Sequence, residues 1–208
     1  MSGALRAAVE RVRAGGLVAY PTETVWGLGA DASSDAAVAS LRRWKGRADD
    51  TPISVLIDAA DALGALGCEP RALASRLADA FWPGPLTLVV HCPRRFAAGV
   101  ARKDGAVGFR CSSHPVASAF AGELARAGVG PVTATSLNRS GEPSVRGLAD
   151  ARALCDAQPG APLLLDLGAD ASAGPESTVL DLTGPRPYVL RWGAVERDEL
   201  FPVLEESA

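Results

Sequence analysis

Short apolar runs alternate with amphipathic stretches along this 208-residue chain, and this alternation restricts the fold more than any other feature. The apolar runs predict buried strands at residues 17–20, 53–57, 86–91, 106–110, 129–135, 163–167, 178–182 and 188–191. The amphipathic stretches predict helices at about 2–14, 34–45, 71–81, 115–127 and 148–155. The segment 22–33 is rich in Gly, Thr and Asp, which predicts a loop. This order is typical of an α/β fold on one sheet, and the closing run of short strands makes that sheet mixed.

The composition indicates one soluble domain, or at most one domain with a small appendage. A chain of 208 residues that is 48% hydrophobic can bury a complete core. The formal net charge is −3, so no general basic field favours nucleic-acid binding, although a local basic groove is compatible with this balance. No apolar run has the length of a signal peptide or a membrane span. We therefore expect a cytoplasmic protein with no membrane association.

The four cysteines, Cys68, Cys92, Cys111 and Cys155, are far apart in the chain and form no Cys-x-x-Cys pair. Structural zinc sites usually draw their ligands from closely spaced pairs, so the pattern disfavours a zinc site. We expect four free, mostly buried thiols and no protein-built metal site.

Polar residues stand at the ends of five predicted strands. They are Thr22, Arg110, the pair Ser136 and Asn138, Ser177, and Arg191. In an open α/β sheet, ligands bind in the crevice beyond the strand ends. Each residue also has an ordinary explanation as a turn residue, a helix cap or a solvated strand end. The recurrence after five strands favours a concave ligand-binding crevice.

Lysine is nearly absent, with two lysines among the 21 basic residues, and one of them lies in the tripeptide Lys45-Gly46-Arg47. A lysine kept in an arginine-rich chain indicates a need for a compact, strongly hydrated point charge. Two cations around a glycine are typical of a site for a phosphorylated ligand. The alternative is a helix that ends in Lys-Gly-Arg, because cations and glycine both favour helix C-termini.

Several short motifs occur in one order along the chain. They are Tyr20-Pro21-Thr22-Glu23-Thr24-Val25-Trp26-Gly27-Leu28-Gly29, Lys45-Gly46-Arg47, Phe81-Trp82-Pro83-Gly84-Pro85-Leu86-Thr87, Arg110 with His114-Pro115, Ser136-x-Asn138-x-Ser140-Gly141, Glu176-Ser177-Thr178-Val179 and Arg191-x-Gly193. Together they resemble the YrdC/TsaC family of threonylcarbamoyl-AMP synthases. The resemblance implies a single YrdC-like domain over residues 1–208, with its core at about 16–193, in the short bacterial form.

Four positions depart from the family pattern. Trp26 replaces a Tyr or Phe, Leu137 replaces an Ala, Leu56 stands where some members carry His, and the stretch 109–112 differs around Arg110. The polar residues that the family uses are all present. The departures therefore concern the shape of the pocket.

The resemblance implies ATP-dependent condensation of L-threonine with bicarbonate or CO2, which yields L-threonylcarbamoyl-AMP and pyrophosphate. The product would serve the threonylcarbamoyladenosine modification of tRNA, through proteins that transfer the threonylcarbamoyl group. The family motifs place Lys45 and Arg47 as the catalytic cations, with Mg²⁺ bridging phosphate oxygens. They place ATP at Lys45, Arg47, Asn138, Arg146 and Arg191, and threonine at Thr22, Arg110, Ser136 and Ser177. Arg110 is expected to bind the substrate carboxylate in a bidentate pair.

Two other interpretations remain open from the sequence. The first is an RNA-binding module of the same fold that acts on tRNA or rRNA without adenylyl transfer. The acidic net charge and the lack of an RNP-like aromatic motif disfavour it. The second is the related carbamoyl-adenylate chemistry of hydrogenase-maturation proteins, but those chains are much longer and carry zinc-finger cysteine pairs.

Overall fold

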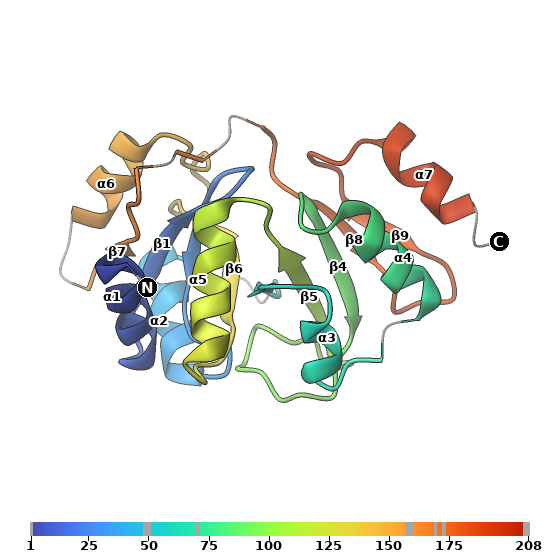
Figure 1. Ribbon diagram of the computed structural model, residues 1–208, viewed down its shortest axis with the longest axis horizontal. Helices are drawn as coiled ribbons and strands as arrows, with labels where there is room; N and C mark the ends of the chain where they lie inside the picture. Colours follow the sequence, from blue (N-terminus) through green and yellow to red (C-terminus); the bar gives the residue numbers. More distant parts are fainter. Residues whose placement is uncertain are drawn as a thin grey trace.

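The computed structural model describes residues 2–47, 51–69, 71–156, 160–168, 170–171 and 174–205 (Figure 1). Its helices are α1 (Gly3–Arg13), α2 (Asp35–Lys45), α3 (Ala62–Ala65), α4 (Ala72–Phe81), α5 (Pro115–Arg126), α6 (Leu148–Asp156) and α7 (Arg197–Glu205). Its strands are β1 (Val18–Pro21), β2 (Trp26–Gly29), β3 (Ser54–Ile57), β4 (Leu86–His91), β5 (Ala106–Cys111), β6 (Val132–Ser136), β7 (Leu163–Leu164), β8 (Thr178–Asp181) and β9 (Tyr188–Arg191).

The nine strands form one sheet in the order β7-β1-β2-β6-β3-β5-β4-β8-β9. Three neighbouring pairs, β1 with β7, β3 with β5 and β4 with β8, are parallel, and the other five are antiparallel. The sheet is therefore mixed, and the predicted single-domain α/β fold is confirmed.

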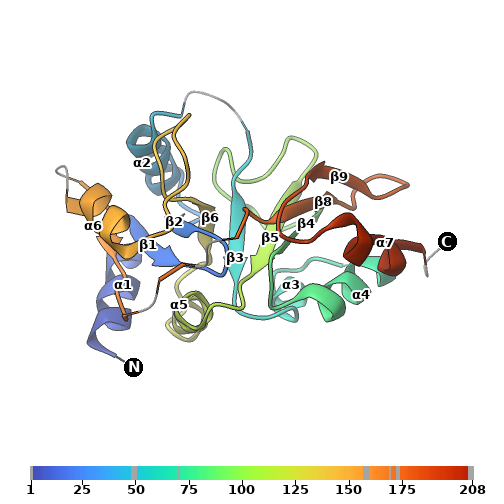
Figure 2. The same ribbon diagram turned by 90° about the horizontal axis from the view of Figure 1, so that it is seen from above.

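Two apolar clusters hold the helices against the sheet. In the smaller cluster, α1 and α5 pack on β1, β3 and β6 through residues such as Val9, Phe120 and Tyr20. In the larger cluster, α2, α4 and α7 pack on the sheet through residues such as Leu41 and Leu77. Seen from above, α2 and α5 lie on opposite sides of β1, β2 and β6, whereas α4 and α7 lie beside β4, β8 and β9 (Figure 2). Helices therefore pack against both faces of the sheet.

Capping side chains begin two helices, α1 and α2, close to their predicted starts. The Ser2 hydroxyl accepts a hydrogen bond from the Leu5 amide, and the Ser34 hydroxyl accepts one from the Ala37 amide. Helix α2 ends at Gly46, whose φ of 66° is the left-handed conformation that glycine adopts without strain. This stop leaves Lys45 in the last helical turn, so the C-cap interpretation of the Lys-Gly-Arg tripeptide is confirmed.

The structure departs from the prediction in several elements. The predicted strand 163–167 is shortened to β7, Leu163–Leu164. The predicted loop 22–33 contains strand β2, which pairs with β1 from Val18↔Gly29 to Pro21↔Trp26. Its two glycines hid the apolar alternation of a strand. Helix α7 was not predicted, because Pro202 lies inside it. The predicted strand 129–135 begins only at Val132, since Gly130 and Pro131 delay it.

Candidate functional site

A cavity of about 500 Å³ opens on one face of the sheet. Of the nine residues predicted for the site, eight line it: Thr22, Lys45, Arg47, Arg110, Ser136, Asn138, Ser177 and Arg191. Arg146 is exposed and does not belong to the described lining. Residues that are far apart in the sequence therefore meet around one space.

The floor of the cavity follows from strand register. Arg110 on β5 pairs with Leu56 on β3 and with Thr87 on β4. Thr87 pairs in turn with Val179 on β8, which pairs with Arg191 on β9. Side chains of directly paired residues point to the same face of a sheet. One row of side chains thus crosses five strands, and all of its members line the cavity.

A second row of paired residues, on β1, β2 and β6, forms another part of the cavity floor. Tyr20 pairs with Gly27, and Gly27 pairs with Ser136. A Cβ atom at Gly27 would lie 2.8 Å from the Tyr20 ring, so glycine is required here. Both residues line the cavity.

Lys45 is buried, and its ammonium group ties α2 to the loop after β6. Nζ donates to the carbonyl oxygen of Ser136 at 2.5 Å, to the carbonyl oxygen of Asn138 at 3.1 Å and to Asn138 Oδ1 at 2.8 Å. Burial and the charge of Arg47 lower the pKa of Lys45, Glu176 opposes them, and the pKa lies at about 8. Lys45 therefore donates three hydrogen bonds in addition to carrying a positive charge.

The Asn138 side chain is held at both ends. Its Oδ1 accepts from the Ser136 hydroxyl at 2.7 Å, and its Nδ2 donates to the Glu142 carbonyl oxygen at 2.6 Å. The backbone amide of Ser140 also donates to the Lys45 carbonyl oxygen at 2.7 Å. The Ser-x-Asn motif and Lys45 thus form one rigid unit at the cavity wall.

Arg110 lies at the floor of the cavity and pairs with Glu23. Its Nη2 donates to Glu23 Oε1, while Glu23 Oε2 accepts from the Ser112 hydroxyl. The side chains of Arg110 and Glu23 are 7% and 17% exposed, so the pair is largely removed from water. Burial alone would raise the pKa of the Glu23 carboxyl, but Arg110 and Ser112 outweigh burial and lower it. Arg110 Nε is buried without a hydrogen-bond partner.

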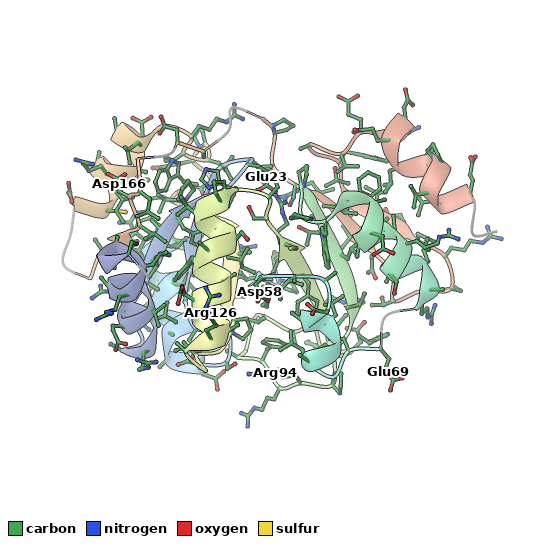
Figure 3. All side chains as sticks on the ribbon, viewed as in Figure 1. Glu23, Asp58, Glu69, Arg94, Arg126 and Asp166 are labelled. Carbon is green, nitrogen blue, oxygen red and sulfur yellow. The ribbon has the colours of Figure 1, made fainter. Side chains whose placement is uncertain are left out.

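Thr22 shapes the turn that carries Glu23. Its hydroxyl donates to the Val25 carbonyl oxygen at 2.6 Å and accepts from the Thr24 and Val25 amides, each at 3.2 Å. This turn presents Glu23 to Arg110 beside the start of α5, where Glu23 is labelled in Figure 3.

On the opposite wall, Arg191 reaches back to the start of β8. Its guanidinium donates to the Ser177 carbonyl oxygen, from Nη2 at 2.9 Å, and to the Ser177 hydroxyl at 3.1 Å, and it pairs with Glu176. The Ser177 hydroxyl also shares a hydrogen bond of 3.0 Å with the Thr87 hydroxyl. Glu176 accepts a further hydrogen bond from Ser144 at 2.5 Å, which links this wall to the loop after β6.

The departures from the family pattern have clear positions. Trp26 and Leu137 are completely buried in the larger apolar cluster, where the Leu137 amide donates to the Trp26 carbonyl oxygen. Neither lies in the described lining of the cavity. Leu56, by contrast, lies on the floor beside Arg110. Of these three departures, Leu56 is therefore the one that shapes the pocket.

Sequence reasoning missed the two carboxylates that hold the site arginines. Glu23 lies inside the Thr-Glu-Thr motif, and Glu176 directly precedes Ser177. Only their positions inside the motifs, and not their residue type, could have marked Glu23 and Glu176 as site residues. Glu23 and Arg110 are 87 positions apart in the sequence, so their ion pair produces no local sequence pattern.

All four cysteines are free and buried. In the part of the chain that the structure describes, no group of three or more His, Cys, Asp or Glu residues is arranged to hold a metal ion. In the same part, no helix is long and apolar enough to cross a membrane.

A sequence profile of the Sua5/YciO/YrdC family, described as "Telomere recombination", matches residues 10–193. The chain belongs to this family. A relative from Mycobacterium tuberculosis is 39% identical over 202 residues, which cover 97% of this chain and 89% of that protein. The Pyrococcus abyssi protein named threonylcarbamoyl-AMP synthase is 36% identical over 206 residues, which cover 97% of this chain and 57% of that protein.

Solved structures of the Sua5/YciO/YrdC family have the same fold. The crystal structure of Pyrococcus abyssi Sua5 complexed with L-threonine matches with a TM-score of 0.86 and 34% identity, over 97% of this chain. The match spans 57% of that solved chain. The confirmed family membership agrees with the resemblance inferred from the motifs.

Proposed function

We propose that the protein synthesises L-threonylcarbamoyl-AMP from L-threonine, CO2 or bicarbonate, and ATP, with release of pyrophosphate. The observation that carries this proposal is the convergence of eight family-motif residues on one cavity of about 500 Å³. A cavity of this size is within the range of small-molecule sites. The threonine bound in the Pyrococcus abyssi relative supports the same substrate class.

The residues of the cavity divide into a threonine side and a nucleotide side, and each wall contributes to both. Arg110, at the cavity floor, binds the threonine carboxylate, and Thr22, Ser136 and Ser177 complete that side. Lys45, Arg47, Asn138 and Arg191 form the nucleotide side, with Lys45 and Arg47 as the catalytic cations. Arg146, which is exposed, would join the nucleotide side only at the rim.

The chemistry needs positioning and charge neutralisation more than a protein nucleophile. The threonine amine adds to CO2 and loses a proton, which gives a carbamate. A carbamate oxygen then forms a bond to the α-phosphorus of ATP as the bond from that phosphorus to the departing pyrophosphate breaks. Fixed cations act most strongly where charge develops on the leaving group, and in a site shielded from water. The three cations of the cavity lining, Lys45, Arg47 and Arg191, suit this step.

Magnesium would enter with the nucleotide. Mg²⁺ is commonly bound through substrate phosphates and one or two carboxylates. The oxygens of Glu176, a carboxylate of the cavity lining, accept from Arg191 and Ser144, so the phosphate oxygens would supply the ligands of the ion. The ion would neutralise the phosphate charge that Lys45, Arg47 and Arg191 do not.

The wider role follows from the product. We place the protein in the cytoplasm, where ATP and tRNA occur, and we expect transfer proteins to carry the threonylcarbamoyl group to tRNA. Direct contact with tRNA stays a prediction. RNA binding without adenylyl transfer is the competing function, and the same assay separates the two.

The test is pyrophosphate release by the purified protein with MgATP, L-threonine and bicarbonate, with each omitted in turn. We expect release to require all three, and the adenylate product to appear by mass spectrometry. Turnover that continues without an amino acid would identify a nucleotide hydrolase instead. Salt-sensitive tRNA binding with no turnover would favour the RNA-binding alternative.

A further inference from the structure

The two neighbours of Arg110 in the sheet differ in polarity. On β4 the neighbour is Thr87, whose hydroxyl shares a hydrogen bond with the Ser177 hydroxyl. On β3 the neighbour is Leu56, which is 2% exposed. Adjacent strands lie about 4.8 Å apart, so a ligand held by Arg110 is within reach of both side chains. Its groups therefore meet a hydroxyl on one flank and a branched aliphatic chain on the other.

The polar flank leads toward the nucleotide side. Thr87 contacts Ser177, and Ser177 accepts from Arg191 at 3.1 Å. The reacting nitrogen of the amino acid must face the nucleotide, because its carbamate attacks the α-phosphorus. With the carboxylate on Arg110 and the nitrogen toward Ser177, the side chain of the amino acid turns toward Leu56.

We propose that Leu56 is a specificity-determining residue that recognises the methyl group of L-threonine and so separates threonine from serine. This inference rests on the proposed function and names the basis of its substrate choice. Threonine and serine share the carboxylate, the amine and the hydroxyl, so an apolar contact is the difference a site can use. Burial of one methyl group is worth about fourfold in binding by area estimates, and enzymes reach tenfold or more per methylene.

The space behind Leu56 makes the inference testable with a larger substrate. Leu56 also lines a second cavity of about 320 Å³, together with apolar residues such as Leu66 and Leu124. The Leu56 side chain thus separates two spaces. Truncation to alanine would remove the contact for the threonine methyl group and connect the site to apolar room behind it.

The experiment compares wild type with Leu56→Ala and the milder Leu56→Val. Substrates are L-threonine, L-serine and L-3-hydroxynorvaline, which carries an ethyl group in place of the threonine methyl. We expect kcat/KM for threonine relative to serine to fall at least about fourfold in Leu56→Ala. The relative value for 3-hydroxynorvaline should rise, and Leu56→Val should lie between the two.

Leu88→Ala is the matched control. Leu88 is a completely buried leucine of the same sheet, but it pairs with Phe109 and lies on the opposite face. It should lose stability to a similar extent while leaving the threonine-to-serine ratio unchanged. If Leu56→Ala does not fold, Leu56→Val and calorimetric binding of the two amino acids give the same ratio.

The outcomes separate this inference from the proposed function. Wild type that releases no pyrophosphate with threonine overturns the proposed function. Wild type that is active, with an unchanged threonine-to-serine ratio in Leu56→Val and Leu56→Ala, overturns the role of Leu56 alone. An equal fall of the ratio in Leu88→Ala would also overturn it, because the effect would then be general loosening of the sheet.

Discussion

The carboxylate of Glu23 holds the guanidinium of Arg110 at the floor of the cavity, and both groups are largely buried. Glu23 is in turn fixed by Ser112, and the turn that carries it is closed by the Thr22 hydroxyl. A charged group taken out of water is costly unless it is paired. The pair therefore keeps a cation in the substrate site before any substrate arrives.

Glu23→Gln should destabilise the protein at pH 7. Loss of one partner leaves the Arg110 charge buried without compensation, which costs about 3 kcal/mol at the lower end of measured cases. The direction in which this stability difference changes with pH follows from the lowered pKa of Glu23. A carboxyl with a lowered pKa stabilises the fold above its unfolded pKa of about 4.3, and this contribution is lost as pH falls through the folded value. Urea unfolding of both proteins at pH 7 and below pH 4 measures it.

The difference between wild type and Glu23→Gln should therefore shrink toward low pH. The double variant Glu23→Gln with Arg110→Met should be more stable than the sum of the two single changes, since no charge is then left unpaired. Glu123→Gln, which removes the partner of the exposed Arg126, is the control and should change stability little. Additive effects at positions 23 and 110 would contradict the buried-pair account.

Arg110→Ala should weaken L-threonine binding far more than ATP binding. A hydrogen bond to a charged group contributes roughly 1.5–3 kcal/mol, so a loss of about 10- to 150-fold in threonine affinity is expected. Calorimetric titration of each ligand alone gives both affinities. Loss of ATP affinity with intact threonine affinity would place Arg110 on the nucleotide side instead.

Strands, caps and motif residues could be predicted because their signals are local. The apolar run at 86–91 became β4 without change, and Ser34 caps α2 as its residue type indicates. Strand β2 could not be predicted, because Trp26-Gly27-Leu28-Gly29 alternates with glycine rather than with polar residues. Gly27 is there for the Tyr20 ring, a contact that exists only in the folded sheet.

The motifs indicated which residues gather at one cavity, but not the hydrogen bonds and ion pairs between them. Lys45 was expected to act as a free point charge, yet it donates to three oxygens of residues 136 and 138. Separations of more than 90 residues leave no pattern in the sequence. Glu23 was passed over because a carboxylate in a site for anionic groups has no apparent use until its arginine partner is visible.

Gly193→Ala should disturb the wall that holds Arg191. A Cβ atom at Gly193 would lie 2.0 Å from the Glu176 carbonyl oxygen and 2.6 Å from the Ser177 carbonyl carbon. These are backbone atoms that cannot give way cheaply, so Glu176 and Ser177 must move and Arg191 loses its contacts. We expect KM for ATP to rise at least about tenfold, the scale of losing one charged hydrogen bond.

Gly147→Ala is the control for this change. The nearest atom to a Cβ at Gly147 is Asp150 Oδ2 at 3.6 Å, which is an ordinary contact. This variant should bind ATP as wild type does. Normal nucleotide kinetics in Gly193→Ala would show that the wall tolerates a shift of β8 and is not set by Glu176 and Ser177.

Lys45 should give the reaction an alkaline limit. The ammonium form makes the three hydrogen bonds that hold Ser136 and Asn138, and burial lowers its pKa to about 8. As pH rises through this value the group loses its proton, so kcat/KM for ATP should fall. Lys45→Met should lower kcat/KM by about 100-fold, the scale of losing one electrostatic stabiliser, and should lose this alkaline limb. Lys45→Arg should restore little of the lost kcat/KM, because a planar guanidinium does not reproduce the three hydrogen bonds of a compact ammonium group.

The stability of the fold should move with pH in the opposite sense. Because the folded pKa of Lys45 lies below the ordinary value of about 10.4, the unfolded chain holds this proton more tightly than the folded protein does. The cost of burying the charge is present below about pH 8 and is relieved between there and the unfolded pKa. Relative to Lys45→Met, wild type should therefore gain stability from pH 7 to pH 9 while its activity declines. Parallel urea unfolding and initial rates at both pH values measure the two trends. An alkaline limb that persists in Lys45→Met, or a parallel fall of stability and activity in wild type, would assign the titration to another group.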